Sequence, residues 1–178
     1  DELKNLRIDL LIWFECNGRH EIPWKLFADG HAPKNGEFIS PYGIWIAEVM
    51  LQQTQLKVVL PYWQKWMKAF PTLTALVEAS EQEVLLLWQG LGYYSRAIRI
   101  KRAANQLLSL IGDADSLDPA NWPRDLESWM SMPGIGRTTA GSIVSSAFDA
   151  QGILLDGNVK RVLTRFHTIK GYPEQSKI

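Results

Sequence analysis

Apolar residues recur at helical spacing along nearly the whole chain, and no stretch of useful length alternates between apolar and polar residues. Near the start, Leu6, Leu10 and Trp13 belong to one apolar stripe if the segment 2–16 is helical. A strand with one buried face needs a period of two, which is missing here. The periodicity therefore predicts an all-α fold. We expect helices over residues 2–16, 42–54, 55–70, 73–79, 81–89, 93–110, 137–148 and 158–168, and a short helix ending at residue 130.

The composition excludes several classes of protein. Of 178 residues, 46% are hydrophobic and 21% charged, which argues against a disordered tail, a collagen-like repeat and a coiled coil. No apolar run approaches the roughly 18 residues of a membrane span, and we expect no signal peptide. The single cysteine, Cys16, allows no internal disulfide, so we expect a reducing, cytoplasmic setting. Because the sequence stops just after a turn signal, we expect a fragment of a longer protein.

The charge is balanced overall but unevenly distributed. Nineteen Lys and Arg residues offset nineteen Asp and Glu residues, whereas a nucleic-acid-binding domain is usually basic. Two acid-free stretches, residues 93–111 and 157–173, nevertheless carry basic residues: Arg96, Arg99, Lys101, Arg102, Lys160, Arg161, Arg165, His167 and Lys170. They indicate either a surface that phosphates approach or ordinary solvated helix faces.

The segment 132–141 is the most specific motif. Gly134 and Gly136 bracket Ile135, which predicts a tight hairpin between two helices. The second helix would begin with free backbone N–H groups, and these form a site for an anion such as a phosphate. A plain helix-turn-helix corner remains an alternative.

Two acids stand out. Asp156 precedes the last helix and is a good N-cap, and a carboxylate held by backbone donors stays ionised. Glu48 shares a helix face with Ile44 and Leu51, so we expect burial to raise its pKa and make it a general acid. A paired structural glutamate is the alternative.

Aromatic residues suggest contacts with bases. Tyr93 follows Gly90-Leu91-Gly92 at a helix start, where an exposed ring followed by arginines suits a wedge that enters a base stack; alternatively, Tyr93 and Tyr94 belong to the core. The Trp24 ring could stack on an extruded purine. Most other tryptophans we assign to the core, including Trp63, Trp66, Trp88 and Trp129.

The hairpin and the aspartate after it resemble the helix-hairpin-helix DNA glycosylase superfamily. Segments 44–55 and 90–96, with Pro23-Trp24, resemble within it the MutY family of adenine DNA glycosylases, and the four motifs follow the family's order. The resemblance implies a six-helix barrel over residues 24–148. It also implies a partial second helical subdomain from residues 1–23 and 149–178, with the active site in the cleft between them.

The resemblance also implies roles for individual residues. Glu48 would protonate the adenine leaving group and Asp156 would stabilise the cationic sugar, with Thr138 and Asn158 as polar support. Trp24, Lys25 and Leu51 would line the adenine pocket. The DNA contacts would be Gln52, Gln53, Thr54, Tyr93, Arg96, Gly134, Gly136, Arg137, Thr139 and Lys160, with Tyr93 as the wedge beside Gln53. The loop over residues 25–40 is longer than the family's usual link, and Lys25 stands where the family commonly has arginine.

The implied activity is removal of adenine mispaired with 8-oxoguanine or guanine in double-stranded DNA. Thr138 stands where the related endonuclease III carries a Schiff-base lysine, which favours hydrolysis to an abasic site without strand cleavage. An endonuclease III-like glycosylase/lyase and a noncatalytic helix-hairpin-helix DNA-binding module remain alternatives.

The resemblance places the four cysteines of the family's 4Fe–4S cluster, and the domain that reads 8-oxoguanine, beyond residue 178. We therefore expect no metal or cofactor on this chain. We expect a monomer that acts on DNA, away from membranes, in the cytoplasm (at the nucleoid in a bacterium).

Overall fold

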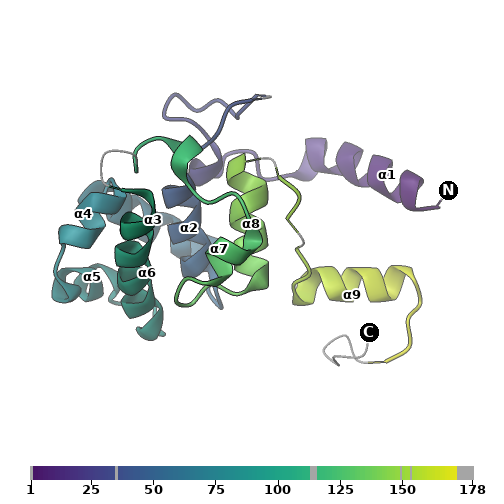
Figure 1. Cartoon of the computed structure of the whole chain (residues 1–178). Coiled ribbons are helices and arrows are strands. Elements are labelled where there is room, and N and C mark those ends of the chain that lie inside the picture. The colour runs from purple at the N-terminus through teal and green to yellow at the C-terminus, as the bar shows by residue number, and fades with distance from the viewer. Residues whose placement is uncertain (1, 35, 113–115, 149, 153, 172–178) are drawn as a thin grey trace.

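The computed structural model describes residues 2–34, 36–112, 116–148, 150–152 and 154–171, and within these ranges every regular element is helical (Figure 1). The all-α prediction is confirmed. The α-helices are α1 (Glu2–Asn17), α2 (Pro41–Leu51), α3 (Leu56–Ala69), α4 (Leu73–Glu78), α5 (Glu81–Trp88), α6 (Ser95–Ile111), α7 (Leu126–Met130), α8 (Arg137–Phe148) and α9 (Gly157–Phe166). Two short 3-10 turns, η1 (Pro23–Lys25) and η2 (Pro119–Asn121), lie in the connections.

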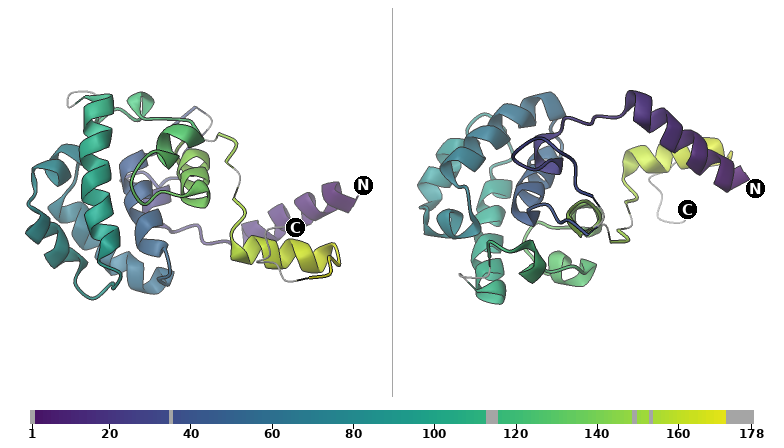
Figure 2. Two further views of the ribbon diagram at one scale, coloured as in Figure 1. Left: turned by 60° about the horizontal axis from the view of Figure 1, so that its bottom comes forward. Right: turned by 90° about the horizontal axis from the view of Figure 1, so that it is seen from above.

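Helix α2 is the centre of the fold. It contacts α3, α6, α8 and η1. Helices α2–α8, which we call the body, lie together with α2 among them (Figures 1 and 2). Ile44, Trp45 and Ile46 have no exposed surface, and Glu48 is the only charged residue of the helix. A helix that is apolar all round is stable only when surrounded by other elements, which explains its central position.

Tryptophans fill the space between the helices. Trp66, Trp88 and Trp129 are fully buried, as predicted, whereas Trp63 lies half-buried at the edge of the core. The rings of Trp66 and Trp88 pack edge to face at 5.8 Å between centroids. The indole N–H groups of these three residues donate to oxygens: Trp66 to Tyr42 Oη, Trp88 to the Gly92 carbonyl and Trp129 to the Pro123 carbonyl.

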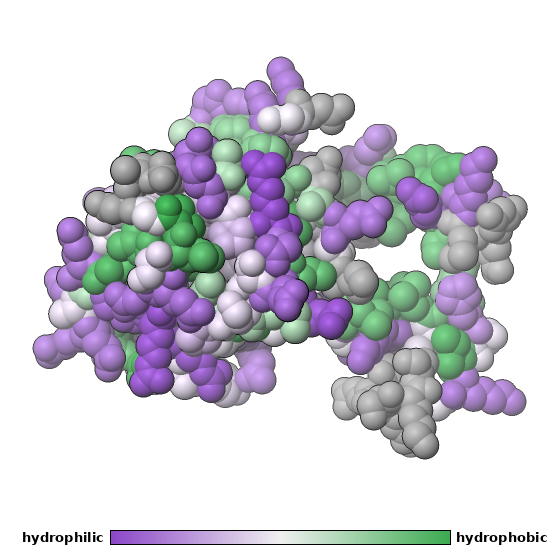
Figure 3. Space-filling model, viewed as in Figure 1, coloured by the Kyte–Doolittle hydropathy of each residue, from purple (hydrophilic) through white to green (hydrophobic). Residues whose placement is uncertain are grey.

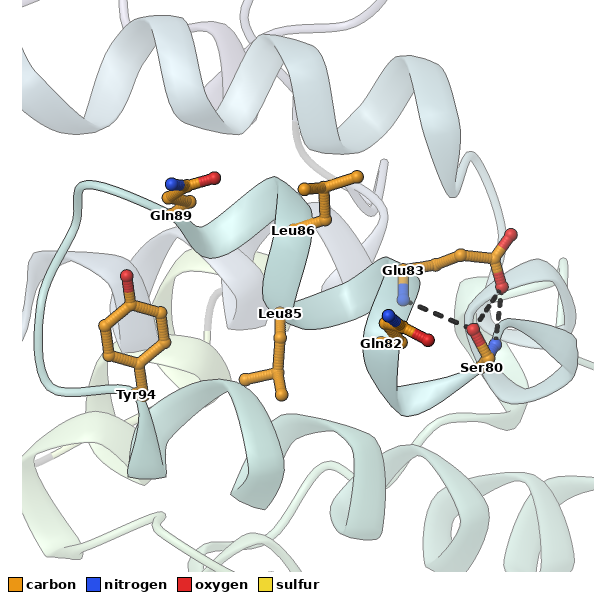
Figure 4. A pocket seen from close by; sticks show the side chains of 7 residues that line it. All are labelled: Ser80, Gln82, Glu83, Leu85, Leu86, Gln89 and Tyr94. Carbon is orange, nitrogen blue, oxygen red and sulfur yellow. Dashed lines mark hydrogen bonds between the residues drawn. The ribbon is translucent and has the colours of Figure 1, made fainter.

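Most helix boundaries follow the sequence, and local signals explain them. At the start of α5, the Ser80 hydroxyl accepts from the Glu83 amide at 3.2 Å, and the Glu83 carboxylate accepts from the Ser80 amide at 2.7 Å (Figure 4). The prediction that the second helix reaches Thr54 is wrong, because α2 ends at Leu51 and Gln53 has φ +59°. Similarly, α6 begins at Ser95, because Tyr93 has φ +50°.

Helices α1 and α9 both lie on one side of the body, beyond α8 (Figures 1 and 2). The apolar stripe predicted on α1 does not reach the core: Leu10 and Trp13 are both more than half exposed, as is Val162 of α9. Figure 3 shows hydrophobic residues over both helices. The division into a barrel over residues 24–148 and a second subdomain from residues 1–23 and 149–178 stays a prediction. Residues 172–178 of the second subdomain lie outside the described ranges. None of the described helices is long and apolar enough to cross a membrane.

Two leucines on neighbouring helices test how the core is assigned. Leu76 of α4 is fully buried, whereas Leu86 of α5 is 70% exposed. We expect Leu76→Ala to lower the free energy of unfolding by about 2–5 kcal/mol, because it removes buried methyl groups and leaves a cavity. Leu86→Ala should change it by less than about 0.5 kcal/mol. Urea unfolding followed by circular dichroism gives both values, and equal losses would contradict the assignment.

Candidate active site

The Glu48 carboxyl lies half-buried on α2, between the buried residues Ala47 and Val49. Desolvation raises its pKa, while a hydrogen bond from Ser142 and the charge of Lys25 oppose the shift. The predicted direction is confirmed. Ser142 was missed by the sequence analysis. Its signal is its position in α8, four residues after Thr138 and therefore on the same helix face.

The glycine segment forms the predicted hairpin between α7 and α8. Met132 and Ile135 point into the core, while Gly136, Arg137 and Thr138 are exposed. Gly134 has φ +82°, and a Cβ placed there would lie 2.9 Å from Arg99 Cδ. The tight turn thus depends on glycine at position 134, and it presents the start of α8 to solvent.

Gln52 connects the end of α2 to this hairpin. Its Nε2 donates to the Gly134 carbonyl and to Thr139 Oγ1, both at 3.3 Å. The structure therefore brings together three of the predicted DNA contacts, through hydrogen bonds between segments more than 80 residues apart.

We use the term probe residues for Gln53 and Tyr93. Both are exposed, Tyr93 to 62%, and both have a positive φ, at +59° and +50°. Such a conformation is uncommon for residues other than glycine and often occurs at functional sites. Tyr94 is also exposed, to 46%, and lines a surface hollow between α5 and α6 (Figure 4). The alternative that both tyrosines belong to the core is wrong.

Arg96 requires a correction. We predicted a contact with the DNA backbone, but its side chain is only 5% exposed and donates hydrogen bonds to protein oxygens at the end of α2 and in the loop before α6. A guanidinium surrounded in this way is not available to a phosphate. Its role is internal to the protein.

The adenine pocket predicted around Trp24 also needs correction. Trp24 is 3% exposed, and its ring packs against Trp63 at 5.4 Å between centroids. A ring face covered in this way does not stack on a base in this structure. Leu51 is half-buried and Lys25 is exposed, and Lys25 also lines a hollow bordered by the last turn of α8.

Asp156 is the N-cap of α9, as predicted. Its Oδ1 accepts from the Val159 amide at 2.8 Å, and Asn158 Nδ2 lies 3.5 Å from its Oδ2. The carboxylate is exposed. Lys160, in the same helix, is half-buried. Among the described residues, no hydrogen bond or ion pair links Asp156, Asn158 or Lys160 to Glu48.

The residues of this chain do not fit an iron–sulfur cluster. A 4Fe–4S cluster takes four thiolate ligands, and the sequence has one cysteine, which lies exposed on α1. Among the described residues, no three His, Cys, Asp or Glu side chains are grouped to hold a metal ion.

The structure thus combines a helical body, a glycine hairpin before α8 and an aspartate at the start of α9, which are the features of a helix-hairpin-helix protein. The profile of the "HhH-GPD superfamily base excision DNA repair protein" family matches residues 46–178, and the chain belongs to that superfamily.

Individual relatives give a more specific comparison than the superfamily. Proteins called "Adenine DNA glycosylase" from Mus musculus and Homo sapiens are 39% and 38% identical over 97% and 99% of this chain. One from Buchnera aphidicola (strain Bp) is 39% identical over 90% of it. The chain spans 32%, 31% and 40% of the length of these relatives, respectively.

Solved structures share the fold at lower identity. A thermostable thymine-DNA glycosylase gives a TM-score of 0.73 at 20% identity. The match covers 92% of this chain and 67% of the thymine-DNA glycosylase chain. A non-covalent endonuclease III–DNA complex gives 0.68 at 21% identity, with coverage of 94% and 70%.

The raised pKa of Glu48 predicts how stability depends on pH. The folded state holds its proton to higher pH than the unfolded state, so stability is lost as pH rises through the folded pKa. We expect Glu48→Gln to remove this contribution and flatten the decline. Unfolding free energies measured from about pH 4 to about pH 8 for both proteins test this. A decline of equal size in Glu48→Gln would assign it to other groups.

The hairpin turn predicts a difference between two glycines. Gly134→Ala should destabilise the fold by about 1–2 kcal/mol, because an alanine would occupy the left-handed region. Gly157, at the start of α9, has open space around an added Cβ, so Gly157→Ala should change stability by less than about 0.5 kcal/mol. Denaturant unfolding measures both, and equal effects would show that the turn does not require glycine.

Proposed function

We propose that the protein carrying this chain is a base excision DNA glycosylase that removes adenine from double-stranded DNA. The observation that carries the proposal is Glu48, the only charged residue of the most buried helix, whose pKa is raised by burial. A carboxyl that keeps its proton to higher pH can act as a general acid. The names of the relatives support adenine as the base.

The reaction begins when the target nucleotide leaves the helix stack, at a cost of a few kcal/mol. The protonated Glu48 carboxyl then donates its proton to the adenine ring. The bond between C1′ of the sugar and N9 of adenine breaks with its electron pair on the base, and C1′ becomes cationic. Water adds to C1′ and gives up a proton to the Glu48 carboxylate, which restores the acid and leaves an abasic site.

Asp156 is proposed to stabilise the cationic sugar, as a carboxylate does in glycoside hydrolysis. Its position as N-cap supports this role, because the Val159 amide fixes the carboxylate. Thr138 on α8 and Asn158 beside Asp156 are proposed to place the sugar and the water. Ser142, which donates to Glu48, joins this set.

DNA binding is proposed along the hairpin and the probe residues. The exposed start of α8, with Gly136 and Arg137, suits a backbone phosphate. Tyr93 and Gln53 are proposed to fill the space that the extruded nucleotide leaves. We further propose adenine opposite guanine or 8-oxoguanine as the target and a monomer as the active form.

Thr138 supports hydrolysis without strand cleavage, because a hydroxyl cannot form an imine with C1′. We expect no protein–DNA adduct when borohydride is added during turnover. A trapped adduct would instead assign the protein to the endonuclease III-like lyases.

The main test is Glu48→Gln in the complete protein. We expect adenine release to fall by about 100-fold or more, because the general acid is lost, while duplex affinity stays within about threefold. The assay is single-turnover incubation with a labelled duplex holding adenine opposite 8-oxoguanine, followed by alkali to cleave abasic sites. Gel-shift titration gives the affinity.

Glu81→Gln provides the matched control, because Glu81 is exposed on α5 and distant in sequence from every proposed contact. The Glu81→Gln protein should release adenine at the same rate as the unmodified protein. Equal losses of binding and release in Glu48→Gln would make the residue structural. Tight duplex binding without base release by the unmodified complete protein would favour a noncatalytic DNA-binding module.

A further inference from the structure

Arg96 is a buried cation. Its side chain is 5% exposed, and within the part of the chain that the structure describes it forms no ion pair with a carboxylate. Burying a charge costs several kcal/mol unless hydrogen bonds compensate it. The compensation here comes from neutral oxygens.

These oxygens fall into two groups, one for each terminal nitrogen. Nη1 donates to three carbonyls at the C-terminal end of α2: Val49 at 3.1 Å, Met50 at 2.9 Å and Gln52 at 2.6 Å. Nη2 donates to Thr54 Oγ1 at 3.3 Å and to the carbonyls of Leu91 at 3.1 Å and Gly92 at 3.2 Å. The negative end of the α2 dipole strengthens the first group. One guanidinium thus joins two loops that are about 40 residues apart in sequence.

Each of these loops carries one of the probe residues. Gln53 lies between Gln52 and Thr54, whose oxygens both accept from Arg96, and Tyr93 follows Gly92 directly. The guanidinium carbon also lies 5.5 Å from the centroid of the Tyr93 ring. The left-handed conformations of Gln53 and Tyr93 are costly, so the surroundings must hold them.

We propose that Arg96 is a positioning residue that sets the spacing between Gln53 and Tyr93, so that both enter the duplex at a single base step. This inference rests on the proposed function. Arginine suits the task because its planar fork donates in two directions at once. Lysine keeps the charge but has a single nitrogen, so it cannot hold both loops in the same way.

The test is a double-mutant cycle in the complete protein. Arg96→Lys is made in the unmodified protein and in a background that carries Gln53→Ala and Tyr93→Ala. Two rates are measured: adenine release in single turnover, and the rise in fluorescence when 2-aminopurine at the target position leaves the stack. Arg7→Lys makes the same exchange at an exposed position on α1 as a control.

In the unmodified protein, Arg96→Lys should slow both rates by about 10-fold or more, because a small misplacement of a positioning contact is costly. In the background without probe side chains it should slow them by less than about twofold, because Arg96 acts through those side chains. Arg7→Lys should leave both rates unchanged in both backgrounds. Equal losses in both backgrounds would overturn the proposal and leave Arg96 with a role in stability alone.

Thermal unfolding shows whether Arg96→Lys is folded. If Arg96→Lys is not folded, Thr54→Val takes its place in the cycle, because it removes one acceptor of Nη2 and leaves Arg96 intact. Thr54 is also an expected DNA contact, so both rates are measured at saturating protein, where a change in affinity does not affect them. A loss confined to the protein with probe side chains supports the proposal, and a loss common to both backgrounds overturns it. If the unmodified protein releases no adenine, the proposed function fails, and the 2-aminopurine cycle still decides the role of Arg96.

Discussion

The burial of α2 is the constraint on which the rest of the structure depends. This helix is apolar on every side, and α3, α6 and α8 enclose it. Enclosure fixes both of its functional features at once. It holds the Glu48 carboxyl where desolvation raises the pKa, and it presents the C-terminal carbonyls of the helix to Arg96. A single packing arrangement therefore positions the proposed acid and the loop that carries Gln53.

The sequence predicted those features that depend on neighbours in the chain. Helical periodicity predicted the elements, the Ser80–Glu83 pair predicted the start of α5, and Asp156 was correctly predicted as the N-cap of α9. Even the raised pKa of Glu48 could be predicted, because its helix neighbours are apolar and a helix with such neighbours must be buried. The hairpin was predicted from Gly134, whose positive φ confirms the reason for glycine there.

The wrong predictions concern contacts between distant segments. Arg96 belongs to a basic stretch and looks like a phosphate contact, but its guanidinium donates instead to carbonyls 46 and 47 residues away and is buried by them. Helix α2 ends at Leu51, three residues before the periodicity predicted, and the carbonyls at this end accept from Arg96. Trp24 follows a proline in a polar loop, and nothing local shows that Trp63 covers its ring. At Arg96 and Trp24, burial by a remote segment leaves no pattern in the neighbouring sequence.

Glu48 and Arg96 are both withdrawn from water in this helical body, and the protein compensates them in opposite ways. Glu48 has a hydrogen bond from Ser142 and a raised pKa, so its burial favours the neutral, protonated acid. Arg96 stays charged and is held by hydrogen bonds to neutral oxygens. Apolar residues of similar size often stabilise a core as well as buried charges do. Stability alone therefore does not account for either residue, whereas the proposed roles, a general acid for Glu48 and a positioning residue for Arg96, account for both.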